Sequence, residues 1–441
     1  MIRKLFAGKV AKNAGWLIGG KIGQMIINLV VGLLTARYLG PANYGLINYA
    51  GAYISFFSAL CTLGINSVLV KELIERPNEQ GEILGSSILM RILSSLLSAV
   101  SIIGIVSIVD RDEPTTILIV ALCTVGIVFH VFEVFNYWFQ AQLRSKVTAL
   151  VSLVAYVITA AYKVLLLVVG ADVVWFALAT SVDYVCIAVF LYGCYRKCGG
   201  DKLKVVWATC KRILSKSCYF ILPGLMVAVY GQTDKLMLKQ MISDEEIGFY
   251  ATATAICGMW CFVLSAIIDS LYPSIMQSHS TGDEAGFERK NKLLYAIVFY
   301  VSMVVSVGFV LLAKPVILIL YGEAYLPAVN PLRIITWYTA FSYLGVARNA
   351  WIVAKDRQKY LIWIYLSAAV ANVLLNLALI PLWGASGAAL ASLVAQILTT
   401  MVVPFFIKPL RRNSMMMVEA ILLRGLFPPS PHLKETIYEH S

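Results

Sequence analysis

The stretch that decides the fold is LLTARYLGPANYGLINYAGAY, residues 33–53. It interrupts a long apolar region with Arg37, the pair Gly40 and Pro41, and a further glycine, Gly45. Glycine and proline are typical of places where one helix ends and another begins, because glycine adopts backbone conformations that other residues avoid and proline cannot continue a helix. The stretch therefore predicts a tight hairpin between two apolar helices.

Apolar segments like the two beside this hairpin recur along the whole chain. Of the 441 residues, 60% are hydrophobic and only 14% are charged, which excludes an ordinary soluble domain. A membrane-spanning helix needs about 20 mostly apolar residues. Segments of this kind lie at 14–34, 46–69, 84–109, 115–139, 148–169, 173–194, 217–238, 249–272, 293–321, 332–353, 360–380 and 384–407. We expect an all-α polytopic membrane protein with 12 transmembrane helices.

The basic residues alternate between successive loops of this arrangement. One side of the membrane receives 26 lysines and arginines and the other side 3, with 7 more inside the spans. Because cytoplasmic loops are enriched in basic residues, both termini are expected in the cytoplasm and the protein in the cytoplasmic, or inner, membrane. The formal net charge of +12 is therefore read as loop anchoring, and no nucleic-acid partner is expected.

The longest polar loop divides the twelve segments into six and six. We expect an N-terminal lobe at 1–195, a cytoplasmic inter-lobe loop at 196–216, a C-terminal lobe at 217–410 and a cytoplasmic tail at 411–441. A shift of 203 residues places Gly45 over Gly248, which suggests a weak internal repeat. Repeats with an even number of spans enter the membrane from the same side, and such repeats enclose a cavity in transporters.

Ionisable residues inside the spans are the candidate functional residues, because a charge in the membrane normally faces a cavity or a partner. Polar stripes at helical spacing accompany three cations, Lys21, Arg91 and Lys163. Lys21 shares its stripe with Gln24 and Asn28, and Lys163 follows Ser152, Tyr156 and Thr159. Candidate substrate-binding residues are Lys21, Gln24, Asn28, Arg91 and Lys163.

Three acidic residues complete the set. Glu133 shares a face with His130, Tyr137 and Gln140, while Asp183 and Asp234 lie in the sixth and seventh segments. They are candidates for ion coupling or for charge pairs. Alternative readings stay open, because Arg91 and Glu133 lie near a membrane surface that their side chains can reach, and Lys163 and Asp183 can neutralise each other.

No motif in the chain indicates an enzyme. The sequence lacks a GxSxG elbow, a P-loop and an HExxH motif, and its four histidines are scattered. We expect no catalytic residues, no metal site and no bound cofactor, while coupling to a proton or sodium gradient stays open. The short external loops also argue against a membrane polysaccharide polymerase or ligase.

Five segments along the chain carry a family resemblance, namely TARYLGPANYGLINYAGA at 35–52, NYWFQAQLRSK at 136–146, TDKLMLKQMISDEEIGFYATA at 233–253, LYGEAYLPAVNPLRI at 320–334 and NVLLNLALIPLWGASGAALASLVAQ at 372–396. They resemble segments of the Wzx-type oligosaccharide flippases, a family of the multidrug/oligosaccharidyl-lipid/polysaccharide (MOP) exporter superfamily. The resemblance implies a MATE-like, V-shaped pair of six-helix lobes.

The same resemblance implies a function and partners. The substrate would be an undecaprenyl-diphosphate-linked oligosaccharide, flipped from the cytoplasmic to the outer leaflet for capsule, O-antigen or other cell-surface polysaccharide, with a polymerase and other assembly proteins as partners. Two alternatives share the fold, namely a multidrug or cation antiporter and a lipid II flippase. The former would use acidic residues for ion coupling, and the latter would usually carry two further spans.

Overall fold

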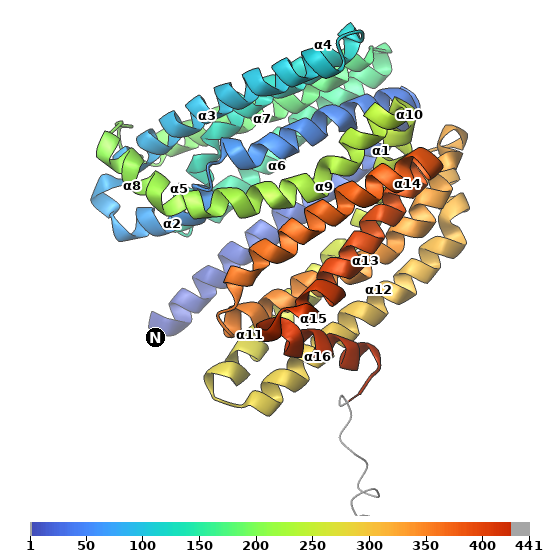
Figure 1. Cartoon of the computed structure of the whole chain (residues 1–441). Coiled ribbons are helices and arrows are strands. Elements are labelled where there is room, and N and C mark those ends of the chain that lie inside the picture. Colours follow the sequence, from blue (N-terminus) through green and yellow to red (C-terminus); the bar gives the residue numbers. More distant parts are fainter. Residues whose placement is uncertain (1, 425–441) are drawn as a thin grey trace, which may run out of the picture. The chain divides into compact units, whose positions relative to one another are not determined.

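The computed structural model describes residues 2–424, and of their side chains those of residues 19, 20 and 22–424. Every regular element in this part of the chain is a helix (Figure 1). The α-helices are α1 (Ile2–Cys61), α2 (Asn66–Glu75), α3 (Gln80–Val109), α4 (Pro114–His130), α5 (Val134–Ala141), α6 (Ser145–Val169), α7 (Val173–Lys197), α8 (Trp207–Ser217), α9 (Ile221–Met241), α10 (Asp244–Gly258), α11 (Cys261–Ser280), α12 (Glu284–Leu320), α13 (Val329–Ala354), α14 (Leu361–Ile397), α15 (Val403–Phe406) and α16 (Arg411–Ile421).

The predicted hairpin at residues 33–53 lies inside α1. Gly40 has non-helical backbone angles, φ 72° and ψ 173°, and Pro41 follows it. This positive φ requires glycine, because a Cβ would clash with the backbone there. The chain reverses direction at this point, so that α1 consists of two helices joined by a turn (Figure 1).

Helices long and apolar enough to cross a membrane account for most of the described residues. Nine such stretches occur among residues 2–424. The stretch Ile22–Glu75 overlaps two of the expected segments, and so does Gln358–Phe406, which breaks at Gly384 with φ 53°. With α13 over the expected segment 332–353, these helices are consistent with twelve crossings.

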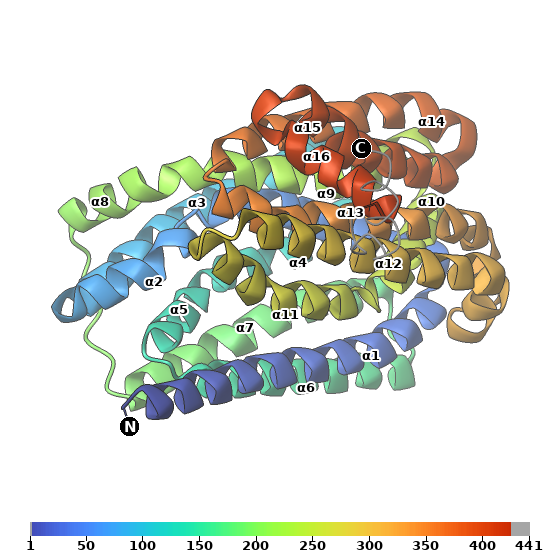
Figure 2. The same cartoon turned by 90° about the horizontal axis from the view of Figure 1, so that it is seen from below.

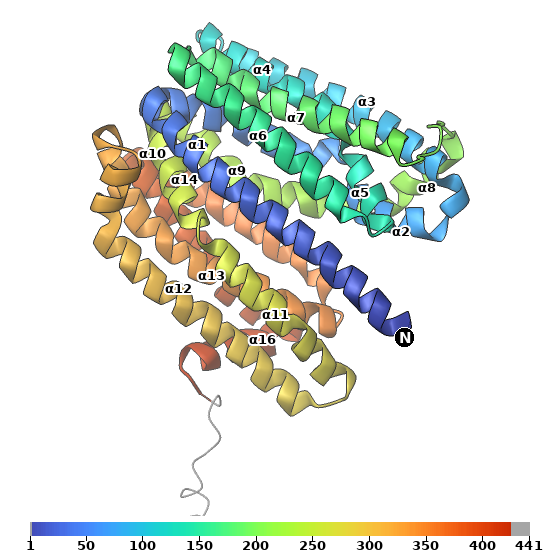
Figure 3. The same cartoon turned by 180° about the vertical axis from the view of Figure 1, so that it is seen from behind.

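The described chain forms two compact units. Unit 1 comprises Met1–Ala251 and Leu320–Tyr325, and unit 2 comprises Thr252–Ile319 and the chain from Leu326 onward. In unit 1, α4 packs along α7, while α1 packs against both α6 and α9 (Figures 2 and 3). The division therefore falls within α10. The division into two lobes of six helices stays a prediction, because the boundary between compact units need not coincide with the boundary between lobes that move in transport.

A reciprocal glycine contact joins the hairpin of α1 to the start of α10 in unit 1. A Cβ on Gly45 would overlap the carbonyl oxygen of Asp244, and a Cβ on Gly248 would overlap the carbonyl oxygen of Pro41. The 203-residue shift pairs Gly45 with Gly248 and Pro41 with Asp244. The two contacts are therefore equivalent under the repeat. We call this contact the glycine seam.

The expected inter-lobe loop at 196–216 contains α8 and is bound to unit 1. Its extended part follows the start of α3, where Lys204 donates a backbone hydrogen bond of 3.1 Å to Gly81. Farther on, α8 binds the carboxylate of Glu72, which is buried. Arg212 Nε lies 3.3 Å from Glu72 Oε2, and Lys216 contacts Glu72 Oε1.

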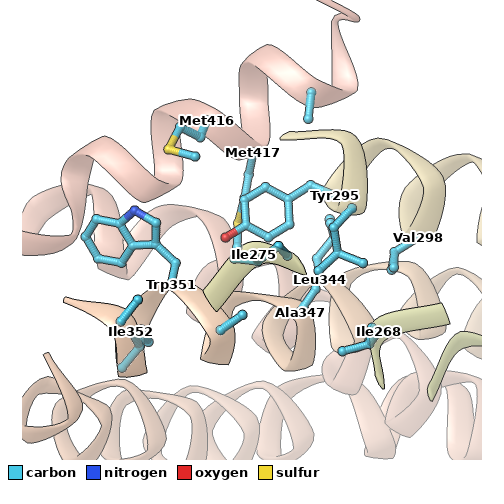
Figure 4. Close-up of a cluster of buried hydrophobic side chains, with 14 of the residues drawn as sticks. Ile268, Ile275, Tyr295, Val298, Leu344, Ala347, Trp351, Ile352, Met416 and Met417 are labelled. Atoms are coloured by element: carbon cyan, nitrogen blue, oxygen red, sulfur yellow. The ribbon is translucent and has the colours of Figure 1, made fainter. Parts of the chain in front are cut away.

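Unit 2 has its own hydrophobic core, to which the C-terminal helix α16 contributes (Figure 4). Met416 and Met417 are fully buried in this core beside Tyr295. Asn413 Nδ2 donates a hydrogen bond of 2.6 Å to Tyr295 Oη. Residues 411–421, which we expected to form part of a tail, are thus a packed helix of unit 2, because their apolar face finds a core. Residues 425–441 lie outside the described residues.

Candidate functional site

A polar stripe on α6 faces α1 in unit 1. Its members recur every three or four residues and so lie on one face of the helix. The stripe consists of Ser145, Thr148, Ser152, Tyr156, Thr159 and Lys163. Gln24 and Asn28 of α1 line the same space, since α1 and α6 pack side by side (Figures 2 and 3). Two cavities lie along this interface.

The first cavity, which we call the Lys163 cavity, lies toward the Val169 end of α6 and has a volume of about 220 Å³. Lys163 and Asp183 both line it, but no described carboxylate oxygen lies within 4.0 Å of the lysine ammonium. Asp183 instead accepts a hydrogen bond of 3.3 Å from Thr159. The full lining is Ile27, Asn28, Val31, Tyr156, Thr159, Ala160, Lys163, Ala179, Thr180, Asp183 and Tyr184. The ammonium is therefore placed to meet a further anion.

The second cavity, which we call the Glu133 cavity, lies toward the Ser145 end of α6 and has a volume of about 390 Å³. Its lining is rich in amides and hydroxyls, and one carboxylate belongs to it. The lining residues are Gly20, Gln24, Glu133, Asn136, Tyr137, Gln140, Ser145, Thr148, Ala149 and Ser152. Among the described residues, no basic side chain lines this cavity.

A buried arginine supports Glu133 from behind. Arg91 is fully buried, and its Nη2 lies 3.9 Å from Glu133 Oε2. His130 Nε2 lies 3.0 Å from the same carboxylate oxygen. Arg91 also donates to Asn66 Oδ1 at 3.3 Å and to the His130 carbonyl at 3.4 Å. Because protein groups surround its guanidinium, Arg91 holds Glu133 and His130 in place and does not line either cavity.

The predicted site residues thus divide into three groups. Gln24, Asn28 and Lys163 line the two cavities, as do Glu133 and Asp183. Arg91 and Asp234 are buried against other protein groups, and Asp234 accepts a hydrogen bond from Tyr250. The side chain of Lys21 lies outside the described residues, so its expected cavity role stays a prediction.

Sequence reasoning missed several lining residues. Ser145 and Thr148 continue the predicted stripe of Ser152, Tyr156, Thr159 and Lys163 by two further steps. Extending the helical spacing toward the start of the segment would have found them. Asn136 follows Glu133 by three residues and precedes Gln140 by four, so the same spacing would have placed it on the face that these two residues share.

A second polar cluster lies beside the glycine seam. The ammonium of Lys239 lies 2.7 Å from both Glu113 Oε2 and Asp244 Oδ1, and its side chain is only 4% exposed. It also lies 5.3 Å from the centre of the Tyr49 ring. The next residue, Gln240, donates to Tyr49 Oη at 3.0 Å and to Asp110 Oδ1 at 2.8 Å. We call this cluster the Lys239 network. It ties the α3–α4 loop to α1, α9 and α10.

Comparisons with solved structures show the fold. An inward-facing multidrug resistance MATE transporter of the MOP superfamily matches with a TM-score of 0.67 at 15% identity, over 90% of this chain and 96% of that chain. The lipid II flippase MurJ matches with a TM-score of 0.67 at 14% identity, over 96% and 95%. A MOP-superfamily transporter from Pyrococcus furiosus, whose binding pocket has reversed polarity, matches with a TM-score of 0.61 at 14% identity, over 93% and 96%.

Sequence comparisons show the family. No curated protein sequence matches the chain significantly. The model of the family described as "Polysaccharide biosynthesis protein" matches residues 10–279, which is more than half of the chain. Its members include the Wzx-like flippases, in agreement with the segments that the sequence shares with them. The chain is therefore a multi-pass membrane protein of the polysaccharide biosynthesis protein family, with the fold of the MOP-superfamily transporters.

Proposed function

We propose that this protein is a flippase that moves an undecaprenyl-diphosphate-linked oligosaccharide from the cytoplasmic to the outer leaflet of the cell membrane. The product would feed the assembly of a capsule, an O-antigen or another cell-surface polysaccharide, with a polymerase and other assembly proteins as partners. The single observation that carries the proposal is the pair of polar cavities along α1 and α6, within helices apolar enough to span a membrane.

The physical reason is the cost of moving a glycan through hydrocarbon. Each hydroxyl that loses its hydrogen bonds in an apolar medium costs a few kcal/mol, so a sugar needs a polar path. The stripe on α6 supplies hydroxyls from Ser145 to Thr159 along one face of the helix. The undecaprenyl tail needs no such path, because it can stay in the bilayer. Alternating access, with the cavities open first to one side and then to the other, would complete the cycle.

A cation in the cavity would stabilise the negative charge of the diphosphate, and Lys163 is placed to do so. Its ammonium lines a cavity without a carboxylate inside ion-pair distance among the described residues. A charge-assisted hydrogen bond to phosphate contributes about 1.5–3 kcal/mol. Lys163 is therefore our candidate contact for the head group, or for an acidic substituent close to it.

Replacing Lys163 by glutamine is expected to reduce flipping at least about tenfold, since the loss of one charged hydrogen bond has that effect on binding. Lys163→Arg should keep part of the activity. The measurement is leaflet-specific detection of the lipid-linked glycan with a lectin or antibody, at matched protein levels in the membrane. Lys71→Gln is the matched control, because Lys71 is exposed and forms an ion pair with Glu75 on α2, which is also exposed. Unchanged flipping in Lys163→Gln would contradict the proposal.

A cation antiporter is the second candidate, and the position of Glu133 favours it. This carboxylate lines a cavity that contains no basic side chain among the described residues. An antiporter would use it to bind a proton, a sodium ion or a cationic drug. Efflux of a cationic dye driven by an imposed proton or sodium gradient in proteoliposomes, and lost in Glu133→Gln, would support this alternative over the flippase.

A further inference from the structure

The Glu133 cavity has unused hydrogen-bonding capacity. Gln24, Gln140 and Ser152 make no hydrogen bond to other described residues, and Oδ1 of Asn136 is buried without a donor. Oε1 of Glu133 likewise accepts no hydrogen bond from a described residue, since His130 and Arg91 both approach Oε2. Donors, acceptors and one carboxylate oxygen thus converge on one space.

The position of the Glu133 carboxylate is fixed on its far side. Arg91 is fully buried and has protein partners on three sides, namely Asn66, His130 and Glu133. The carboxylate therefore lies between the arginine and the cavity. A ligand in the cavity meets the carboxylate, and the guanidinium stays behind it. Among the described residues, a ligand in this cavity meets one carboxylate and several neutral polar groups.

This combination suits an uncharged sugar. A carboxylate only accepts hydrogen bonds, so Oε1 of Glu133 can accept from a sugar hydroxyl, while the amides and hydroxyls can both donate and accept. The Tyr137 side chain adds an apolar surface for the C–H face of a sugar ring. The volume of about 390 Å³ lies in the range of small-molecule sites. A second carboxylate placed here would be repelled, and like charges at close range cost several kcal/mol.

We propose that the Glu133 cavity is a sugar subsite that accepts neutral sugar residues and rejects sugars that carry a carboxylate. The proposal rests on the proposed flippase function and assigns its selectivity. The two cavities then divide the substrate along α1 and α6: the anionic part lies near Lys163, and a neutral part of the glycan lies near Glu133.

The test is saturation-transfer NMR on the purified full chain in detergent. The probes are the methyl glycosides of glucose, galactose and mannose and, matched to them, the methyl glycosides of the corresponding uronic acids, which we call uronates. The two members of each pair differ only in the carboxylate at C6. We expect the wild type to transfer saturation to at least one neutral glycoside and on the order of tenfold less to its uronate. In Glu133→Gln the uronate should reach the level of the neutral glycoside.

Two further variants distinguish a change in sugar preference from a loss of folded protein. Gln140→Lys places a cation in the same cavity at an exposed position and should raise uronate binding above the wild-type level. Glu75→Gln makes the same chemical change on α2, far from the cavity lining, and should keep the wild-type preference. A gain of uronate binding cannot result from misfolding.

The remaining outcomes overturn the proposal. Equal transfer to both members of every pair in the wild type would do so, as would an unchanged preference in Glu133→Gln, or no transfer to any neutral glycoside. Flipping of the lipid-linked glycan is measured separately in proteoliposomes. A sugar preference without flipping would therefore refute the flippase and leave the subsite, whereas flipping without a preference would refute the subsite alone.

Discussion

Replacing Gly45 by alanine is expected to destabilise the protein by about 3 kcal/mol, the upper end of the cost of overpacking a well-packed contact. The new methyl group would overlap the carbonyl oxygen of Asp244, which is backbone and cannot rotate away. Gly248→Ala should have a similar effect, because its methyl group would overlap the carbonyl oxygen of Pro41. Thermal unfolding of the purified variants in detergent measures both changes, and flipping should fall with them.

The sign of this effect is informative, because alanine normally stabilises a helix relative to glycine by about 1 kcal/mol. Gly51→Ala is the matched control in the same helix, since a Cβ there meets no atom within 4 Å. It should leave stability unchanged or raise it. A Gly45→Ala protein as stable as the Gly51→Ala protein would show that the glycine seam is not a tight contact.

The glycine seam marks a part of the fold that could not be predicted from the sequence. The hairpin and the all-helical membrane fold followed from Gly40, Pro41 and the apolar segments around them, and the family followed from the segments that resemble those of the Wzx-type flippases. The 203-residue shift indicated that Gly45 and Gly248 are equivalent, but it gave no indication that each lies against the other's hairpin. Such a contact depends on two backbones 200 residues apart, and glycine leaves no side-chain pattern that periodicity could detect.

The candidate site was predictable where it followed helical spacing. The stripe from Ser152 to Lys163 and the face shared by Glu133 and Gln140 line the two cavities, and the roles of these residues stay predictions. Arg91 shows the limit of this approach. Its polar stripe predicted a face toward a cavity, but the side chain is buried against Asn66 and His130. Periodicity identifies a polar face, and whether the face meets substrate or protein depends on packing between helices.

Replacing Lys239 by methionine is expected to cost about 3 kcal/mol of stability, the lower end for breaking a buried ion pair. The ammonium is buried between Glu113 and Asp244, and its loss leaves these two carboxylates without their shared cation. The lower end applies because Glu113 is 52% exposed and can regain water. The loss should appear in thermal unfolding at neutral pH, and Lys71→Met, which breaks only an exposed pair, should stay within about 1 kcal/mol of wild type.

The free energy of unfolding at acid pH shows whether Lys239 stabilises the protein through its charge or only by filling space. The hydrogen bond from Lys239 lowers the pKa of Glu113 below its ordinary value of 4.5. The contribution of this pair is therefore complete above pH 4.5 and is lost as the pH falls through the lower folded-state pKa. In Lys239→Met this part of the acid-dependent loss should vanish.

Adding Asp244→Asn to Lys239→Met should restore part of the stability, because it removes the repulsion between the two carboxylates. If the double variant is no more stable than Lys239→Met and the acid-dependent loss is unchanged, Lys239 acts by filling space and the Lys239 network is not electrostatic.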